Sequence, residues 1–182
     1  RLLIRTNDPL HKRLIVPVTL VVPAYLQAAN AGGGDYTDLY GDLWAADQQY
    51  GEGSWGYVSR SQTLKTKQAI AGTDDDPLYQ DLRQDIDEYR FDGLPAGTYQ
   101  IELRFAEIRP TRPSRRLFDV IVEDDLALYA HDVAREVGTL AADDHTFYAA
   151  VTDGQLNVRF IPRRGYRKPI LNAIRVTHRP DL

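Results

Sequence analysis

The stretch YRFDGLPAGTYQIELRFAEI, residues 89–108, decides the fold class. In its second half, apolar residues at positions 99, 101, 103 and 105 alternate with polar residues at 100, 102 and 104. A period of two is that of a β-strand, so the pattern predicts a strand with one buried face and one wet face. Before it, residues 94–97 read Leu-Pro-Ala-Gly, with proline early and glycine late, which is typical of a tight turn.

The rest of the chain follows the same plan of short apolar runs separated by turn residues. Four further runs are rich in β-branched and aromatic residues: LIVPVTLVV, RLFDVIVEDDLALY, HTFYAAVTDGQLNVRFI and PILNAIRVT. Asp153 and Gly154 form a turn signal between two of the strands. This spacing predicts an all-β sandwich. Only residues 78–90, LYQDLRQDIDEY with its flanks, have the pattern of a helix, and their charges suit a solvated surface segment as well.

Bulk composition excludes several classes. A chain of 182 residues is long enough for one domain with a core. A net charge of −4 and a pI near 5.5 argue against general nucleic-acid binding. The chain has no cysteine, hence no disulfide, thiolate zinc site or cysteine nucleophile. The apolar run 14–22 is too short to span a membrane and contains Pro17. Because the chain begins at Arg1, we expect a processed product or an excerpt of a longer protein.

Three consecutive glycines in NAGGGDYTD, residues 30–38, raise the question of a phosphate-binding loop. Such a loop ends in a Lys-Ser/Thr pair and leads into a helix, and neither feature follows here. Asp35 and Asp38 would instead repel a phosphate. We therefore expect a structural turn.

Residues 1–22 read as a strand, an Asn-Asp-Pro turn and a second strand. We divide the chain into an N-terminal β-hairpin extension, residues 1–23, and a β-sandwich, residues 24–182. A two-stranded hairpin alone is marginal in water. It is expected to pack against its own domain, to be a remnant kept by an arbitrary cut of a longer chain, or to add strands to a neighbouring subunit.

From about residue 26 to 178 the sequence resembles a malectin domain, a carbohydrate-binding β-sandwich also found in bacterial extracellular multidomain proteins. The segments that carry the likeness are NAGGGDYTD, WAADQQYGEGSWGY, GTDDDPLYQ, YRFDGLPAGTYQIELRFAEI, RLFDVIVED, VTDGQLNVRFI and PILNAIRV. The resemblance implies a jelly-roll-like β-sandwich, and it places the glycine run in a turn after the first core strand. The hairpin resembles the end of a bacterial immunoglobulin-like module.

Sugar binding needs an aromatic face for stacking and rigidly held polar groups. Trp44, Trp55, Tyr50 and Tyr57 fall within one glycine-rich stretch and supply candidate aromatic faces, although one of the tryptophans is equally explained as a plug of the core. The resemblance implies a ligand site at one end of the sandwich, with Trp44 and Trp55 at its two loop aromatic positions.

Two further positions of the implied site depart from the family pattern. An aromatic pair is replaced by Arg109 and Pro110, and an acidic residue is replaced by Arg167. The loops 109–116 and 163–168 carry eight Arg or Lys residues between them. Because arginine binds carboxylates, sulfates and phosphates through two parallel hydrogen bonds, we expect Arg109 and Arg167 to contact an acidic group of a glycan.

Two alternatives for these loops remain open. They could meet the acidic stretch 72–88 of a neighbouring copy in a head-to-tail contact. They could also be solvated surface charges.

Catalysis is not predicted. His11, His131, His145 and His178 show no metal-ligand spacing, and no serine occupies a nucleophile-elbow motif. Asp74, Asp75 and Asp76 read as a turn or cap, with calcium as the alternative and no other cofactor.

The sequence thus predicts a non-catalytic, extracellular or cell-surface module that binds an oligosaccharide or polysaccharide. The alternative is a structural subunit of a surface fibre or layer assembled by strand addition through residues 1–22. Neither nucleic-acid binding nor membrane insertion is expected.

Overall fold

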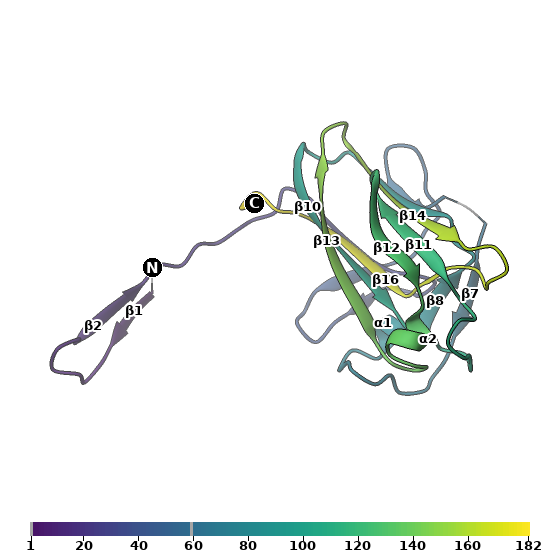
Figure 1. The fold of residues 1–182 in the computed structure, drawn as a ribbon. Helices are drawn as coiled ribbons and strands as arrows, with labels where there is room; N and C mark the ends of the chain where they lie inside the picture. Colours follow the sequence, from purple (N-terminus) through teal and green to yellow (C-terminus); the bar gives the residue numbers. More distant parts are fainter. Residues whose placement is uncertain (1, 59) are drawn as a thin grey trace.

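A computed structural model gives the fold and describes residues 2–58 and 60–182 (Figure 1). Two stacked β-sheets form the body. The six-stranded sheet has the order β13-β10-β16-β3-β5-β4, and the five-stranded sheet has the order β12-β11-β14-β9-β6. The bounds in the six-stranded sheet are β3 Leu26–Asn30, β4 Tyr36–Thr37, β5 Leu43–Ala46, β10 Gly97–Phe105, β13 Asp143–Val151 and β16 Ala173–His178. In the five-stranded sheet they are β6 Trp55–Tyr57, β9 Glu88–Asp92, β11 Phe118–Val122, β12 Asp125–His131 and β14 Gln155–Pro162.

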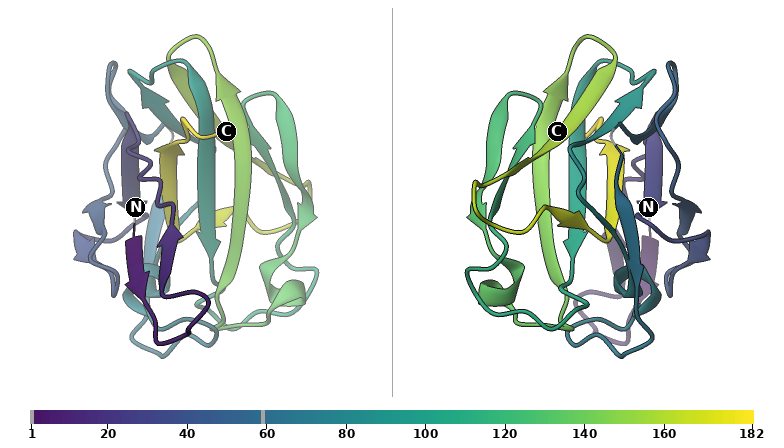
Figure 2. Two further views of the ribbon diagram at one scale, coloured as in Figure 1. Left: turned by 90° about the vertical axis from the view of Figure 1, so that its left-hand side faces the viewer. Right: turned by 90° about the vertical axis from the view of Figure 1, so that its right-hand side faces the viewer.

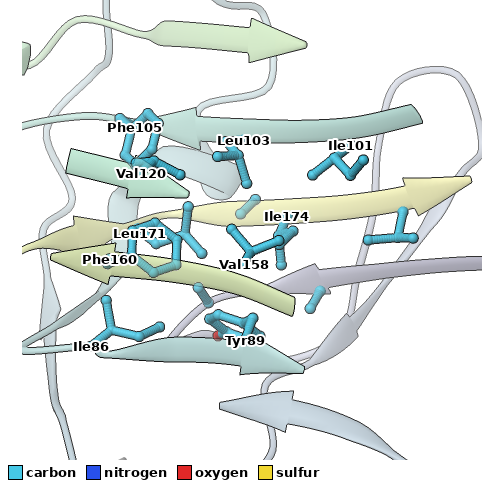
Figure 3. Close-up of a cluster of buried hydrophobic side chains, with 14 of the residues drawn as sticks. Ile86, Tyr89, Ile101, Leu103, Phe105, Val120, Val158, Phe160, Leu171 and Ile174 are labelled. Carbon is cyan, nitrogen blue, oxygen red and sulfur yellow. The ribbon is translucent and has the colours of Figure 1, made fainter. Parts of the chain in front are cut away.

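The two sheets bury one face of each strand against the other, as the alternation predicted. On β10, Tyr99, Ile101, Leu103 and Phe105 are buried, whereas the intervening polar residues are half-buried. Figure 3 shows β10 side chains packing with Val158 and Phe160 of β14 and with Ile174 of β16. The β-sandwich expected from period-two patterning is confirmed.

A third, smaller sheet lies beside the two main ones (Figure 1). It has the order β15-β8-β7, with β7 Gln62–Lys65, β8 Asp81–Gln84 and β15 Ile170–Leu171. The two helices, α1 Pro77–Gln80 and α2 Val133–Glu136, are single turns and far too short to cross a membrane.

The prediction of a helix over residues 78–90 is wrong. Only α1 is helical; the chain becomes extended at Asp81, forms β8, and enters β9 at Glu88. Leu78, Leu82 and Ile86 recur every four residues, which mimics a helix, but each is buried by neighbouring strands. Tertiary packing here overrides the local pattern.

The glycine run forms a turn directly after β3, as expected. Gly32 has a φ of +78°, and a Cβ there would lie 2.5 Å from the carbonyl oxygen of Leu82. A Cβ at Gly33 would lie 2.3 Å from the side chain of Asn30. The run is structural because the backbone approaches its neighbours where a side chain would clash.

The N-terminal hairpin consists of β1 Leu2–Arg5 and β2 Arg13–Val16, which form a sheet of their own. Figure 1 shows it standing away from the sandwich, joined by an extended segment. All the strand residues are exposed except Val16, which is half-buried. The expectation that the hairpin packs against its own domain is therefore wrong; addition to a neighbouring subunit stays a prediction.

Candidate functional site

Arg109 and Arg167 line one hollow of about 400 Å³ next to strands β7 and β8 of the small third sheet. Arg109 follows β10, and Arg167 lies in the loop between β14 and β15. A bridge between Arg116 and Arg167, with a 2.9 Å hydrogen bond from the Arg167 amide to the Arg115 carbonyl, holds the two loops together. Residues of both basic loops thus line one space, which we call the basic hollow, and the ligand-binding role of Arg109 and Arg167 stays a prediction.

An ion pair forms part of the lining of the basic hollow. Arg116 and Glu107 are 3% and 1% exposed, and Arg116 Nε lies 2.5 Å from Glu107 Oε1. The Arg116 guanidinium also donates to the Lys168 carbonyl and, at 3.4 Å, to Gln84. Both charges are therefore committed to the protein, and they fix the loop that carries Lys168.

The charges at the rim are more available. Lys168 lies 3.1 Å from Asp85 in an exposed pair, which contributes little in water. The Arg167 guanidinium donates one 3.3 Å hydrogen bond to the Thr111 hydroxyl. Among residues 2–58 and 60–182, neither Arg109 nor Arg167 has an ion-pair partner. Two arginines without an ion-pair partner among the described residues therefore line the same space.

The apolar part of the lining consists of Leu64, Leu82 and Ile108. A larger hollow of about 680 Å³ adjoins at Arg109 and is lined by Tyr36, Lys65, Lys67, Gln80 and others. The two hollows together offer apolar surface, hydrogen-bonding groups and positive charge, which is the mixture found in small-ligand sites.

Trp44 does not belong to this surface, and its predicted role as a stacking platform is wrong. Its side chain is 0% exposed, and its Nε1 donates a 3.0 Å hydrogen bond to Asp38. The guanidinium carbons of Arg104 and Arg175 lie 4.4 and 5.2 Å from the centre of its ring. Trp44 is therefore a core residue, which is the alternative that the sequence analysis gave for one of the two tryptophans.

Asp38 holds the Trp44 region in place. Its carboxylate accepts hydrogen bonds from the backbone amides of Tyr40 and Asp42 as well as from Trp44. Burial alone would raise the pKa of Asp38, but these donors outweigh burial and hold the pKa below its ordinary value. The carboxylate is thus ionised at neutral pH and satisfied within its own loop.

Trp55, Tyr57 and Tyr50 lie on or beside the edge strand β6 and are half-buried. The Trp55 ring stacks on Phe91 at 6.4 Å between centroids, and Arg83 covers Tyr57 at 3.5 Å. Tyr50 donates a 2.6 Å hydrogen bond to Asp92, which raises the pKa of Tyr50. Trp55, Tyr50 and Tyr57 do not line the basic hollow. Their ligand-binding role stays a prediction, separate from that of Arg109 and Arg167.

The aspartates 74–76 are used largely by their own chain. Asp75 accepts hydrogen bonds from the Tyr36 hydroxyl and the Leu39 amide, and Asp76 accepts one from the Ile70 amide. Within the described part of the chain, these three residues do not gather three metal-ligand atoms at one point. Their contacts fit the turn reading better than the calcium reading.

The wider acidic stretch is also paired internally. Asp81 lies 3.3 Å from Lys65, Glu88 lies 2.8 Å from Arg90, and Asp85 pairs with Lys168. A head-to-tail contact with a basic neighbour would compete with these pairs, which weakens that alternative.

Sequence reasoning missed Glu107 and Gln84 as lining residues, whereas it counted Arg116 and Lys168 among the basic residues of the two loops. Glu107 and Arg116 belong to quoted segments, yet nothing in their spacing shows that they form a buried pair. Arg163, counted among the basic loop residues, instead lies 2.9 Å from Asp119 and 4.1 Å over the ring of Tyr129. Only a subset of the eight basic residues therefore reaches the hollow.

Comparison with known proteins gives a consistent family match. The family model described as the malectin domain matches residues 25–174. Malectin-B of Xenopus laevis is 28% identical over 137 residues, which cover 72% of this chain and 48% of the relative. Malectin of Mus musculus is 27% identical, with 72% and 45% covered. The chain spans about half the length of these relatives.

Solved structures show the same fold. A β-glucuronidase of Bacteroides uniformis matches with a TM-score of 0.76 and 29% identity, covering 85% of this chain and 18% of the enzyme. The extracellular domain of ANXUR2 from Arabidopsis thaliana matches with a TM-score of 0.72 and 15% identity, covering 84% and 49%. The second likeness concerns the fold alone.

Proposed function

Because this chain belongs to the malectin domain family, whose domains bind carbohydrate, we propose that its sandwich is a non-catalytic module for a glycan with acidic groups. The observation that carries the proposal is the basic hollow, which Arg109 and Arg167 both line without an ion-pair partner among the described residues. Guanidinium groups bind carboxylates and sulfates bidentately, with twice the strength of neutral hydrogen bonds.

The charge balance of the hollow supports an anionic ligand. Arg109, Arg116, Arg167 and Lys168 supply four cations, whereas Glu107 is the one carboxylate among the described lining residues. Arg116 already pairs with Glu107, so an incoming anion meets the rim cations rather than the carboxylate. A neutral sugar would leave Arg109 and Arg167 without a charged partner.

An apolar side chain can receive the C–H face of a sugar ring. Leu64 is half-buried and offers a small surface of this kind, whereas Leu82 and Ile108 are buried beneath the hollow, and no aromatic ring lines the basic hollow within the described residues. Without stacking on a ring, affinity should rest on the acidic groups and lie in the micromolar to millimolar range. Trp55, with Tyr50 and Tyr57, would at most contact a more distant part of a long chain.

The likeness to a β-glucuronidase agrees with an acidic sugar, because glucuronides carry a carboxylate. One such neighbour is described as covalently bound to cyclophellitol-6-carboxylate aziridine, which also bears a carboxylate. The likeness covers only 18% of that enzyme, so it supports a ligand class and not an enzymatic activity.

The arrangement of carboxyl groups supports a binding role rather than hydrolysis. Glycoside hydrolases generally use two carboxyl groups that face each other across the bond to be cleaved. In the basic hollow, Glu107 is held by Arg116, and a second carboxylate is absent from the described lining residues. Because polysaccharides are met outside the cell, the proposal also places this domain in an extracellular or cell-surface protein.

Affinity electrophoresis with polygalacturonate tests the proposal, and its methyl-esterified form serves as the uncharged control. The acid form should retard the protein and the ester should not. Arg109→Ala or Arg167→Ala should each weaken binding about tenfold, since a hydrogen bond to a charged group contributes about 1.5–3 kcal/mol. Arg164→Ala is the matched control, because Arg164 is exposed and lies outside the hollow. Equal retardation by acid and ester, or wild-type binding by both hollow variants, would contradict the proposal.

A second candidate function is that of a structural subunit that assembles through residues 1–22. The observation in its favour is the hairpin itself, whose apolar side chains Leu2, Leu3, Ile4, Leu14 and Ile15 are all exposed. This function does not exclude sugar binding, because the hairpin stands away from the sandwich (Figure 1).

A further inference from the structure

Three ligand-bearing side chains meet at one edge of the sandwich, although their sequence spacing gave no sign of it. His131 ends β12, and Asp143 and His145 begin β13. One ligand atom from each residue lies within 4.8 Å of the other two. The spacing of the histidines in the sequence gives no sign of this group, because His131 and Asp143 belong to edge strands of two different sheets that lie at the same side of the molecule (Figure 2).

The contacts within this group are short but poorly directed. Nε2 of His131 lies 3.0 Å from Asp143 Oδ2, and Nε2 of His145 lies 3.0 Å from Asp143 Oδ1. Yet both Nε2 atoms and Asp143 Oδ2 are buried without a directed hydrogen-bond partner. His131 and Asp143 are 6% and 7% exposed, so water does not replace the missing bonds at low cost.

We propose that His131, Asp143 and His145 form a binding site for a divalent transition metal ion, with Zn²⁺ as the first candidate. Two imidazoles and one carboxylate are a ligand set that Zn²⁺ accepts, with a water molecule in the fourth position. Tetrahedral Zn²⁺ with bonds of about 2.0–2.1 Å separates its ligand atoms by about 3.3 Å. Each imidazole nitrogen lies 3.0 Å from one Asp143 oxygen, and one ligand atom from each of the three residues lies within 4.8 Å of the others.

Aromatic rings pack against the His131, Asp143 and His145 group, and His145 connects the group to solvent. The rings of Phe105 and Phe118 lie 5.2 and 5.5 Å from that of His131, and Phe147 stacks on His145. These aromatic rings shield the buried side of the group. The side chain of His145 remains 26% exposed and gives an ion access from solvent.

The backbone of β11 and β12 departs from regular strand geometry close to His131. The pairing of β11 with β12 shifts between Phe118 and Val120, which is a bulge, and Ala130 has a φ of +49°. Bulges redirect side chains near functional sites, and a left-handed alanine costs energy that its surroundings must offset. Regular pairing would not be expected to keep His131 in the same orientation.

The position suggests what the ion does. β12 is the edge strand of the five-stranded sheet, and β13 is the edge strand of the six-stranded sheet. Figure 2 shows these green and yellow-green strands at the same side of the molecule. A bound ion would join the two sheets across their open edge and stabilise the sandwich.

Calorimetry and thermal unfolding of the metal-stripped full chain test the site with Zn²⁺ alone. We expect one Zn²⁺ per chain and, at a hundredfold excess over Kd, an increase in Tm of about 5–10 °C. Mg²⁺ should give neither response, since it prefers oxygen ligands.

His145→Ala is the main variant because its side chain is partly exposed, so the apo fold should survive. It should weaken Zn²⁺ binding by more than the roughly 10–100-fold that outer-sphere changes cost. Asp143→Asn, which keeps the side-chain shape, should do the same if His145→Ala fails to fold. His11→Ala, in the exposed hairpin, is the control and should bind as the wild type does. Absence of Zn²⁺ binding, a response to Mg²⁺ as large as that to Zn²⁺, unchanged binding in both site variants, or loss of binding in His11→Ala would each overturn the proposal.

Discussion

Gly32 and Gly34 stand two residues apart in the same run, but their surroundings differ. Gly32 has a left-handed φ, and a Cβ there would strike the Leu82 backbone, whereas a Cβ at Gly34 would meet nothing within 4 Å. Gly32→Ala should therefore lower the free energy of unfolding by at least about 2 kcal/mol. Gly34→Ala should change it by about 0.5 kcal/mol or less. Urea unfolding of both variants measures the difference, and equal losses would refute this account of the turn.

The same scale explains what could be predicted of the site. Residue type and order place Arg109 and Arg167 at the ends of loops that the resemblance brings together, and they do share a hollow. The order of residues in the sequence cannot show which tryptophan side chain is buried in the core. Trp44 and Trp55 look alike in sequence, yet Trp44 is covered by Arg104 and Arg175, whereas Trp55 is only half-buried.

At the level of elements, predictability depends on whether burial follows a single period. β10 is buried on one face along its whole length, so its alternation survives in the sequence. Residues 78–90 cross from a helical turn through β8 to β9, and Asp85 has a φ of +62° between the strands. Apolar residues in these three short segments are buried by different neighbours. Their spacing of four residues therefore resembles that of a helix although the chain is mostly extended. The His131, Asp143 and His145 group cannot be read from the sequence for a related reason, because a bulge in the pairing of β11 with β12 and the stacking of two separate sheets assemble it.

The N-terminal hairpin is an element whose removal should not affect the sandwich. β1 and β2 pair only with each other among the described strands. A chain lacking residues 1–19 keeps Val21 and Pro23, which lie against the sandwich beside Leu26. Its Tm should stay within about 2 °C of the full chain, because no core contact is lost. Scanning calorimetry provides the measurement; a decrease of more than about 5 °C would mean that the hairpin packs on the sandwich.

For the whole molecule, the hairpin is the feature that ties fold to assembly. Leu3 and Ile15 pair on one face, and Ile4 and Leu14 pair on the other, so both faces are apolar. A lone two-stranded sheet of this kind is marginal in water, and exposed apolar strands favour pairing with another chain. We therefore expect the full chain to self-associate through residues 1–22 and the chain lacking residues 1–19 to be monomeric.

Light scattering over a range of concentrations tests this expectation with matched variants. Ile15→Asp places a charge on the apolar face of the hairpin and should return the full chain to a monomer without changing its Tm. Thr19→Asp, an equally exposed site beyond β2, should leave the assembly intact. A monomeric wild type would remove the structural-subunit function, whereas an assembly that survives Ile15→Asp would place the contact elsewhere. Because the hairpin and the basic hollow are separate, polygalacturonate binding by the truncated monomer would show that assembly and sugar binding are independent functions.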